Sequence, residues 1–358
     1  MNSKPLNKQD LTNEIKAEAL RLGFFACGIA KAAPVDATTA TEVKRWLDNG
    51  CFGDMAYMNN YTDKRLNPKL LMPGLKSIVC VAMSYAPAKR IPEGQYQLAS
   101  YAYGQDYHEV VKGKLRQLAT HFGFEPHTED TTLACSSCIN AIPKFRVFCD
   151  SAPILERYWA VKAGLGWTGR NHQLIIPKAG SMFVLGELFL DIELNYDEEM
   201  PNRCGTCYKC IDICPTKALG TPEETMGKQT FLFNAERCLS YQTIEYRGDL
   251  QPEMANAMGD TIYGCDKCQT ICPWNAHPVA TNIVELSPRP ELMNMTREQW
   301  HNLTEDDYKR LFKGSAVKRA KYAGLMRNIK AVEQYQKLHR LQDNKGQDAL
   351  NNNEENKQ

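Results

Sequence analysis

Two cysteine-rich runs with a shared spacing lie in the second half of the chain. The first, Cys204 to Pro215, reads CGTCYKCIDICP and spaces four cysteines as C-x2-C-x2-C-x3-C-P. The second, Cys265 to Pro273, reads CDKCQTICP and has three cysteines. Each [4Fe–4S] cubane is held by four thiolates, which short turns of this kind direct at one centre. The two runs therefore predict a pair of [4Fe–4S] clusters.

The ligands are expected to be shared between the runs. In two-cluster ferredoxins the cysteine before the proline ligates the cluster of the other run. The first cluster is then expected to be held by Cys204, Cys207, Cys210 and Cys272. The second cluster is left with Cys214, Cys265 and Cys268. The nearest unassigned thiol is Cys238, which lies between the runs in RCLSYQ, and we assign it as the fourth ligand.

Zinc sites and disulfide bonds are the alternative uses of so many cysteines. Four cysteines within eleven residues, ending in proline and largely repeated downstream, favour iron–sulfur chemistry instead. Cys135 and Cys138, in CSSC, could form a redox pair or be incidental loop residues. Cys27, Cys51 and Cys80 lie in or beside apolar segments and fit the hydrophobic core.

Composition sets broad limits on the class of protein. The chain has 358 residues, 43% of them hydrophobic, which is enough for two or three domains. Its 43 basic and 42 acidic residues give a formal charge of +1, so no global charge marks it for nucleic acids or membranes. We find no apolar run long enough to span a bilayer and no export signal, so we expect no membrane partner. Free thiols and clusters indicate the reducing cytoplasm, where we expect a monomer.

The first half of the chain predicts alternating helices and strands. Residues 11–22 have helical spacing, and the apolar segment 24–30 that follows predicts a buried strand. Ser77 to Tyr85 is a continuous apolar run that predicts a central strand. Residues 106–122 predict a helix, with Asp106 as its N-cap.

A strand and another helix are expected next. Phe145 to Cys149 predicts a short strand, and Pro153 is placed in the first turn of the following helix. Asp150 or Ser151 would then cap this helix. Residues 181–194 predict a pair of strands.

A G-x-G-x-x-G match occurs at Gly164, Gly166 and Gly169. A dinucleotide site requires a strand before this motif and a helix after it, because the helix N-terminus holds the pyrophosphate. Here a helix comes first and a strand over 173–177 follows. We therefore reject nicotinamide binding and expect a tight turn or a close backbone approach to a ligand.

Several segments, together with the double cysteine run, resemble epoxyqueuosine reductases. They are Lys64 to Pro68, Asp106 to His108, Phe148 to Arg157, Ala163 to Asn171 and Val317 to Asn328. The resemblance implies a cobalamin-dependent enzyme with two [4Fe–4S] clusters. It implies that the enzyme removes the epoxide oxygen from epoxyqueuosine at the wobble position of tRNA, the last step to queuosine.

The resemblance also implies an α+β fold in several domains. Residues 1–195 would form an α/β cobalamin-binding and catalytic domain, and residues 196–286 a ferredoxin-like iron–sulfur domain. Residues 287–330 would form a short, basic, HEAT-like helical region. Residues 331–358, rich in Asn, Gln and Glu, are expected to be a disordered tail.

The resemblance assigns Asp150 as the proton donor to the epoxide oxygen, with a carboxyl pKa raised by the corrin face. From the residues alone, the role of helix cap is preferred for Asp150. Further cobalamin contacts are implied for Arg65, Tyr107, His108, Asp150, Gly169, Asn171, Ser240 and Tyr241. The alternative for Arg65 is a solvated side chain, and for Tyr107 and His108 it is packing or capping. Gly169 and Asn171 could instead form a turn, and Tyr241 could be a core residue.

The basic stripe from Lys313 to Lys330 is the local candidate for contacts to tRNA phosphates, the alternative being a solvated helix face. An electron donor such as a flavodoxin or ferredoxin system is also expected. Two other functions remain open: a cytoplasmic cobalamin and iron–sulfur reductase of a small molecule, similar to reductive dehalogenases, and a ferredoxin-type electron carrier. A carrier does not need the long segment that precedes the clusters.

Overall fold

The computed structural model describes residues 7–128, 142–222, 224 and 232–337. A five-stranded sheet of order β1-β2-β8-β5-β4 forms the centre of the first lobe. Its strands are β1 (Ala26–Lys31), β2 (Ser77–Ser84), β4 (Glu125–Pro126), β5 (Lys144–Phe148) and β8 (Phe183–Leu190). All neighbours are antiparallel except β4 and β5. Every residue of β2 is buried, as its continuous apolar run predicts for a strand covered on both faces.

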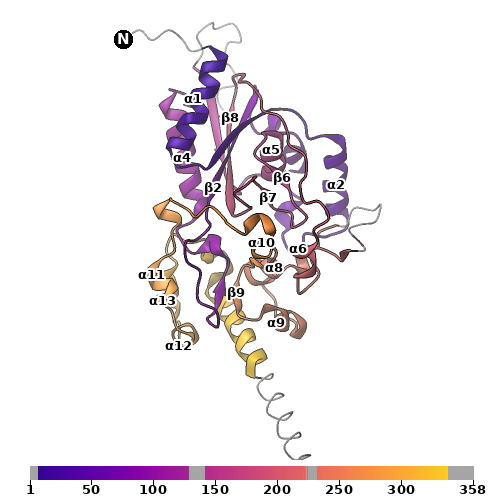
Figure 1. Ribbon diagram of the computed structural model, residues 1–358, viewed down its shortest axis with the longest axis vertical. Helices are drawn as coiled ribbons and strands as arrows, with labels where there is room; N and C mark the ends of the chain where they lie inside the picture. Colours follow the sequence, from indigo (N-terminus) through magenta and orange to yellow (C-terminus); the bar gives the residue numbers. More distant parts are fainter. Residues whose placement is uncertain (1–6, 129–141, 223, 225–231, 338–358) are drawn as a thin grey trace, which may run out of the picture.

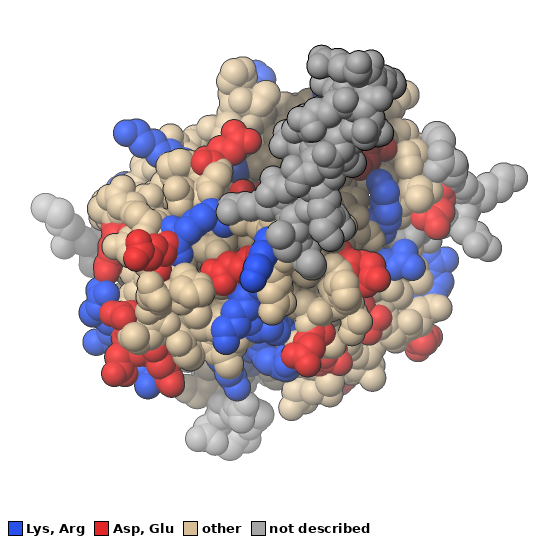
Figure 2. All heavy atoms as spheres, turned by 90° about the horizontal axis from the view of Figure 1, so that it is seen from below, with Lys and Arg blue, Asp and Glu red and all other residues tan. Residues whose placement is uncertain are grey.

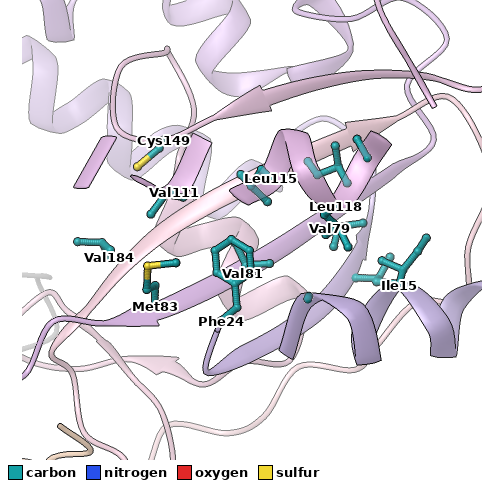
Figure 3. Packing of buried hydrophobic residues seen from close by; sticks show 14 of the residues in the cluster. Ile15, Phe24, Val79, Val81, Met83, Val111, Leu115, Leu118, Cys149 and Val184 are labelled. Atoms are coloured by element: carbon teal, nitrogen blue, oxygen red, sulfur yellow. The ribbon is translucent and has the colours of Figure 1, made fainter. Parts of the chain in front are cut away.

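Helices cover both faces of this sheet (Figure 1). One face carries α1 (Lys8–Arg21) and α4 (Tyr107–His121), whose apolar residues meet Val79 and Val81 of β2 in one core (Figure 3). The other face carries α5 (Glu156–Lys162), which packs with Ile78 and Phe189. Outside these layers lie α2 (Ala37–Asp48) and α3 (Thr62–Leu66), and the small hairpin of β6 (Trp167–Thr168) and β7 (Leu174–Ile175).

The predicted start of α5 is wrong. The helix begins at Glu156, and Leu155 occupies the N-cap position without a side-chain cap. Residues 150–153 form bends instead, and Asp150 has a left-handed backbone with φ of 54°. In contrast, Asp106 caps α4 as predicted, because its Oδ1 accepts the backbone N–H of His108 at 3.1 Å. Asp150 therefore does not cap α5.

The strand pair predicted over residues 181–194 is the single strand β8. Gly186 sits in the middle of β8 and need not mark a turn. A Cβ atom at this position would lie 2.5 Å from Val111 Cγ1 of α4. The glycine therefore allows α4 to pack closely on the sheet.

A second lobe contains the cysteine runs and the C-terminal region. Its elements are α6 (Lys209–Asp212), α8 (Leu239–Ile244), α9 (Pro252–Met258), β9 (Thr261–Tyr263), α10 (Lys267–Thr270), α11 (Pro290–Met293), α12 (Arg297–His301) and α13 (Glu305–Leu311). Short 3-10 helices in the chain are η1 (Ala56–Met58), η2 (Pro68–Leu70), η3 (Ser100–Ala102), η5 (Ala235–Arg237), η6 (Pro273–Asn275), η7 (Val284–Leu286) and η8 (Ala316–Ala320). The strand β3 (Gln97–Leu98) pairs with β9, so residues 91–103 belong to the core of this lobe.

The last described helix covers residues 321–337 and extends beyond the predicted boundary at residue 330. Val332 is fully buried in the core of the second lobe, so a disordered tail starting at residue 331 is wrong for residues 331–337. Residues 338–358, and the predicted pair Cys135 and Cys138, lie outside the described residues. No helix within the described ranges is long and apolar enough to cross a membrane.

The sheet depends on a close approach that only glycine allows. A Cβ atom on Gly28 of β1 would lie 2.0 Å from the carbonyl oxygen of Ala163, so we expect Gly28→Ala to lower the free energy of unfolding by about 1–3 kcal/mol. Gly113 lies in α4 with open space around it, and we expect Gly113→Ala to raise that energy by about 0.5–1 kcal/mol. Urea unfolding of both variants checks the contrast, and equal effects would contradict it.

Candidate active site

The first predicted set of cysteines comes together at the junction of the two runs. The short helices α6 and α10 pack against each other and bring the runs face to face. Burial, then the neighbouring thiols of Cys272, Cys204 and Cys207, raise the pKa of the Cys210 thiol to about 11. These four thiols therefore form one group. It includes Cys272, the cysteine that precedes the proline of the second run.

The second predicted set also comes together. Burial raises the pKa of Cys268 well above its usual value, and the thiols of Cys265 and Cys238 raise it further. Cys214 in turn faces Cys238, which stands at the N-cap of α8. Among the described residues no His, Cys, Asp or Glu side chains converge tightly enough to hold a single metal ion. Four thiolates on a cubane bind different iron atoms and need not meet at one point.

Asp150 lies on the loop between β5 and α5, with its side chain 58% exposed. The Tyr107 hydroxyl donates a hydrogen bond to Asp150 Oδ2, and His108 Nε2 lies 3.5 Å from the same oxygen. Burial and the charge of Asp150 raise the pKa of Tyr107, so this phenol keeps its proton and donates it. The predicted trio of Tyr107, His108 and Asp150 is thus assembled around an accessible carboxyl.

His108 lies between two carboxylates. Its Nδ1 is 2.6 Å from Asp106 Oδ1, and its Nε2 faces Asp150. Burial opposes protonation, but the hydrogen bonds and charges of Asp106 and Asp150 raise the pKa of His108 to about 9. The imidazole is therefore a cation at neutral pH, and Nε2 presents a proton to Asp150.

Two glutamates behind Asp150 were missed by the sequence analysis. Glu156 accepts the backbone N–H of Asp150, and Glu187 of β8 lies fully buried beyond it. Burial, then the charge of Asp150, raise the pKa of Glu156 to about 8, and burial raises the pKa of Glu187 well above its usual value. The available signal for Glu187 was its place as the one acid within the apolar stretch FVLGELFL, residues 183–190.

Arg65 is buried, contrary to the alternative of a solvated arginine. Its side chain is 6% exposed, its Nη2 donates to the Tyr57 carbonyl at 3.5 Å, and its Nε has no partner within the described part of the chain. The Tyr57 phenol faces both Asp150 and Arg319 of the C-terminal region. Tyr57 therefore lies between Asp150 of the first lobe and Arg319 of the C-terminal region.

The loop 163–171 connects the first lobe to both cysteine runs. Asn171 is 3% exposed and donates to the Cys268 carbonyl at 3.4 Å, while Arg170 donates to the Cys207 carbonyl at 3.3 Å. A Cβ atom on Gly169 would lie 2.8 Å from Asn171 Oδ1, so the glycine permits this turn. The indole of Trp167 in this loop has no partner for its Nε1 in the described residues.

A series of tyrosines joins the Asp150 region to the second run. Tyr107 packs edge-on against Tyr101 with ring centroids 5.8 Å apart, and Tyr101 packs against Tyr85 at 6.3 Å. The Tyr85 hydroxyl donates to Gln269 Oε1 at 3.2 Å, one residue beyond Cys268. The carboxyl and the second thiol group are therefore linked through packed side chains.

Ser240 and Tyr241 follow Cys238 at the start of α8. The backbone N–H groups of both residues face the Cys238 sulfur. The Tyr241 side chain is buried, and its hydroxyl accepts the Asp54 backbone N–H at 2.8 Å. Tyr241 thus packs against the first lobe, which is the core role left open for it.

Part of the basic stripe is used within the fold. Arg319 makes a bidentate pair with Glu245, and Arg327 donates to the carbonyls of Gln242, Tyr246 and Gly248. Lys313, Lys318, Lys321 and Lys330 are exposed, and so is Arg319 despite its pairing. Figure 2 shows basic and acidic side chains intermixed on this end of the molecule.

Comparisons with known proteins agree with this arrangement. Residues 65–151 match the family described as Epoxyqueuosine reductase QueG, DUF1730, and residues 203–275 match the 4Fe-4S double cluster binding domain. The epoxyqueuosine reductase of Cellulophaga algicola is 40% identical over 322 residues, which cover 90% of this chain and 98% of that protein. The Escherichia coli enzyme is 35% identical over 334 residues, covering 91% of this chain and 82% of that protein.

Solved structures agree as well. An epoxyqueuosine reductase bound to an epoxyqueuosine-modified tRNA-Tyr stem loop has a TM-score of 0.74 and 25% identity, covering 91% of this chain and 81% of that one. A Bacillus subtilis epoxyqueuosine reductase with its aspartate-bearing catalytic loop swung out of the active site has a TM-score of 0.74 and 26% identity, with the same coverage. The extent of these matches shows that the chain belongs to the epoxyqueuosine reductase family.

Proposed function

We propose that this protein reduces epoxyqueuosine to queuosine at the wobble position of tRNA. The observation that carries the proposal is the accessible Asp150 carboxyl, which a phenol and an imidazolium contact and which packed tyrosines link to the second of two groups of four thiols. A proton source for the epoxide oxygen is therefore connected through packed side chains to the thiols that would hold the electron supply. The wobble base lies in a single-stranded loop, so it can be unstacked to reach Asp150.

The two thiol groups are proposed to hold the clusters as assigned from the sequence. All the cysteines within the described residues are free thiols, which suits thiolate ligation. Their grouping, with Cys272 beside the first run and Cys238 beside the second, supports four ligands for each cluster. A flavodoxin or ferredoxin system is proposed to supply the electrons.

Cobalamin is proposed as the third cofactor, held by residues 1–195, which include the loop 163–171. Two buried donors without partners in the described residues, Arg65 Nε and Trp167 Nε1, fit a ligand edged with carbonyl and phosphate oxygens. When bound, cobalamin would supply a two-electron reductant charged by single electrons from the clusters. Asn171 and Gly169 are proposed to line its rim, and residues 287–330 to form a HEAT-like contact to the RNA.

Proton delivery follows from the contacts of Asp150. The Tyr107 hydroxyl and the His108 imidazolium both direct protons at Asp150 Oδ2. We propose that Asp150 gives a proton to the epoxide oxygen and takes the next one from His108 Nε2. The carboxyl would thus obtain its proton from these neighbours rather than from enclosure alone.

Replacing the proposed proton donor tests the assignment. We expect Asp150→Asn to slow single-turnover formation of queuosine by about 10²- to 10⁴-fold, because proton donation is commonly worth this much. Iron content and binding of the RNA stem loop should be unchanged. Asp48→Asn, at an exposed aspartate at the end of α2, is the matched control. A wild-type rate in Asp150→Asn would exclude the carboxyl from the reaction.

The fourth ligand of the second cluster is tested by iron analysis. Cys238→Ala should lower the iron content of anaerobically purified protein from about eight to about four atoms per chain, because each cubane needs its ligand set. Cys51→Ala removes a buried thiol outside both groups and should leave the iron content unchanged. Eight irons in Cys238→Ala would show that another group completes the cluster.

The charge on His108 can be measured directly. We expect its imidazole to titrate near pH 9 in an NMR titration of the folded protein, with the proton present below that pH and lost above it. Asp106→Asn should lower this pKa, because it removes one of the two facing charges while keeping an N-cap for α4. A His108 that titrates near its ordinary value in the wild type would contradict the proposed proton source.

A further inference from the structure

Asp150 has a backbone conformation that its own side chain disfavours. Its φ is 54°, in the left-handed region that non-glycine residues rarely adopt, and residues 150–153 form bends rather than a helix or strand. Such a conformation persists only where the surrounding structure imposes it. A contact from outside the loop is therefore needed to hold the Asp150 backbone in place.

Glu156 supplies that contact from the first turn of α5. Its Oε1 accepts the backbone N–H of Asp150, six residues earlier in the chain. The helix that carries Glu156 is fixed in turn, because α5 packs on β1, β2 and β8 and its Trp159 is buried in the core on that face of the sheet. The backbone of Asp150 is therefore attached to an element whose position is set by the core.

The carboxyl of Asp150 is held by α4, the helix on the other face of the sheet. The hydroxyl of Tyr107 donates a hydrogen bond to Asp150 Oδ2. The preceding residue, Cys149, is fully buried in the core beside α4. With Cys149 fixed, the φ angle of Asp150 sets the direction in which its side chain leaves the loop. A return of φ to its usual negative range would turn the carboxyl away from Tyr107.

We propose that Glu156 is a positioning residue that keeps the Asp150 carboxyl aimed at the place where it would protonate the epoxide oxygen. The inference rests on the proposed function, because Glu156 acts only through Asp150. The contact requires an acceptor oxygen that reaches the Asp150 amide, and it does not require a charge. Glutamine supplies that oxygen at the same length, leucine has no acceptor, and aspartate is one methylene shorter.

Hydrogen–deuterium exchange of the cluster-loaded protein tests the contact without substrate. We expect Glu156→Leu and Glu156→Asp to speed exchange of the Asp150 amide by about tenfold, because exchange requires this hydrogen bond to open. Mass spectrometry of peptides covering residues 149–155 measures it. Glu156→Gln should exchange as slowly as the wild type, and so should Glu253→Leu, the control at an exposed first-turn acid of α9. Wild-type exchange in Glu156→Asp would overturn the proposal even if Glu156→Leu does not fold.

Single-turnover formation of queuosine on a stem loop gives the second readout. We expect Glu156→Leu to slow it by about tenfold, less than direct loss of a general acid at about 10²- to 10⁴-fold, with unchanged stem-loop affinity. Glu156→Gln should restore most of the rate. In an Asp150→Asn background, Glu156→Leu should cause no further loss, because nothing remains for it to position. A further loss there, or a wild-type rate in Glu156→Leu, would refute the positioning role.

The two readouts also separate this inference from the proposed function. A wild-type protein without turnover on the stem loop would refute the proposed function. Faster exchange at Asp150 in Glu156→Asp would in that case still establish that Glu156 holds the loop.

Discussion

The contact between the loop 163–171, strand β8 and the second cysteine run fixes the first lobe in place relative to the cysteines. Asn275, next to this run, is buried and fully used: its Oδ1 accepts the Ser181 N–H at 2.7 Å, and its Nδ2 donates to the Gln269 carbonyl at 2.8 Å. A buried amide with all its groups paired fixes one geometry, because any slip would leave polar atoms unpaired. The start of β8 is thereby attached to the segment that carries Cys268 and Cys272.

The acids of the active site work against stability. Asp106, Asp150 and Glu156 gather around the His108 imidazolium, and Asp150 adopts a left-handed backbone that non-glycine residues rarely use. Such strain and repulsion persist only where the surrounding fold enforces them, and they concentrate at functional sites. Here the enforcement comes from β8, in which every residue after Phe183 is buried, and from the buried face of α4. A rigid sheet thus supports a locally unfavourable cluster of charge.

Sequence patterns predicted the parts that depend on local spacing. The grouping of the cysteines, including Cys238, followed from ligand counting, and the cap of α4 followed from Asp106 preceding a periodic segment. Patterns could not show that Gly186 serves close packing rather than a turn, because the partner Val111 is distant in sequence. The neighbouring residues also could not decide the role of Asp150, because a helix N-cap and a carboxylate that accepts a hydrogen bond from a distant tyrosine can have the same local sequence. Glu187 could be seen as an anomaly, but its meaning required the fold to place it behind Asp150.

The C-terminal helix, residues 321–337, forms hydrogen bonds with the segments around α8 and β9. Asn328 is fully buried and donates to the carbonyls of Thr243 in α8 and Ile262 in β9, at 2.9 and 2.8 Å. Arg327 binds the carbonyls just after α8, the helix that Cys238 starts. Because these groups satisfy the end of a short helix that is otherwise marginal, they hold the fourth thiol of the second set in position. The C-terminal helix therefore supports the segment of the second lobe that carries Cys238.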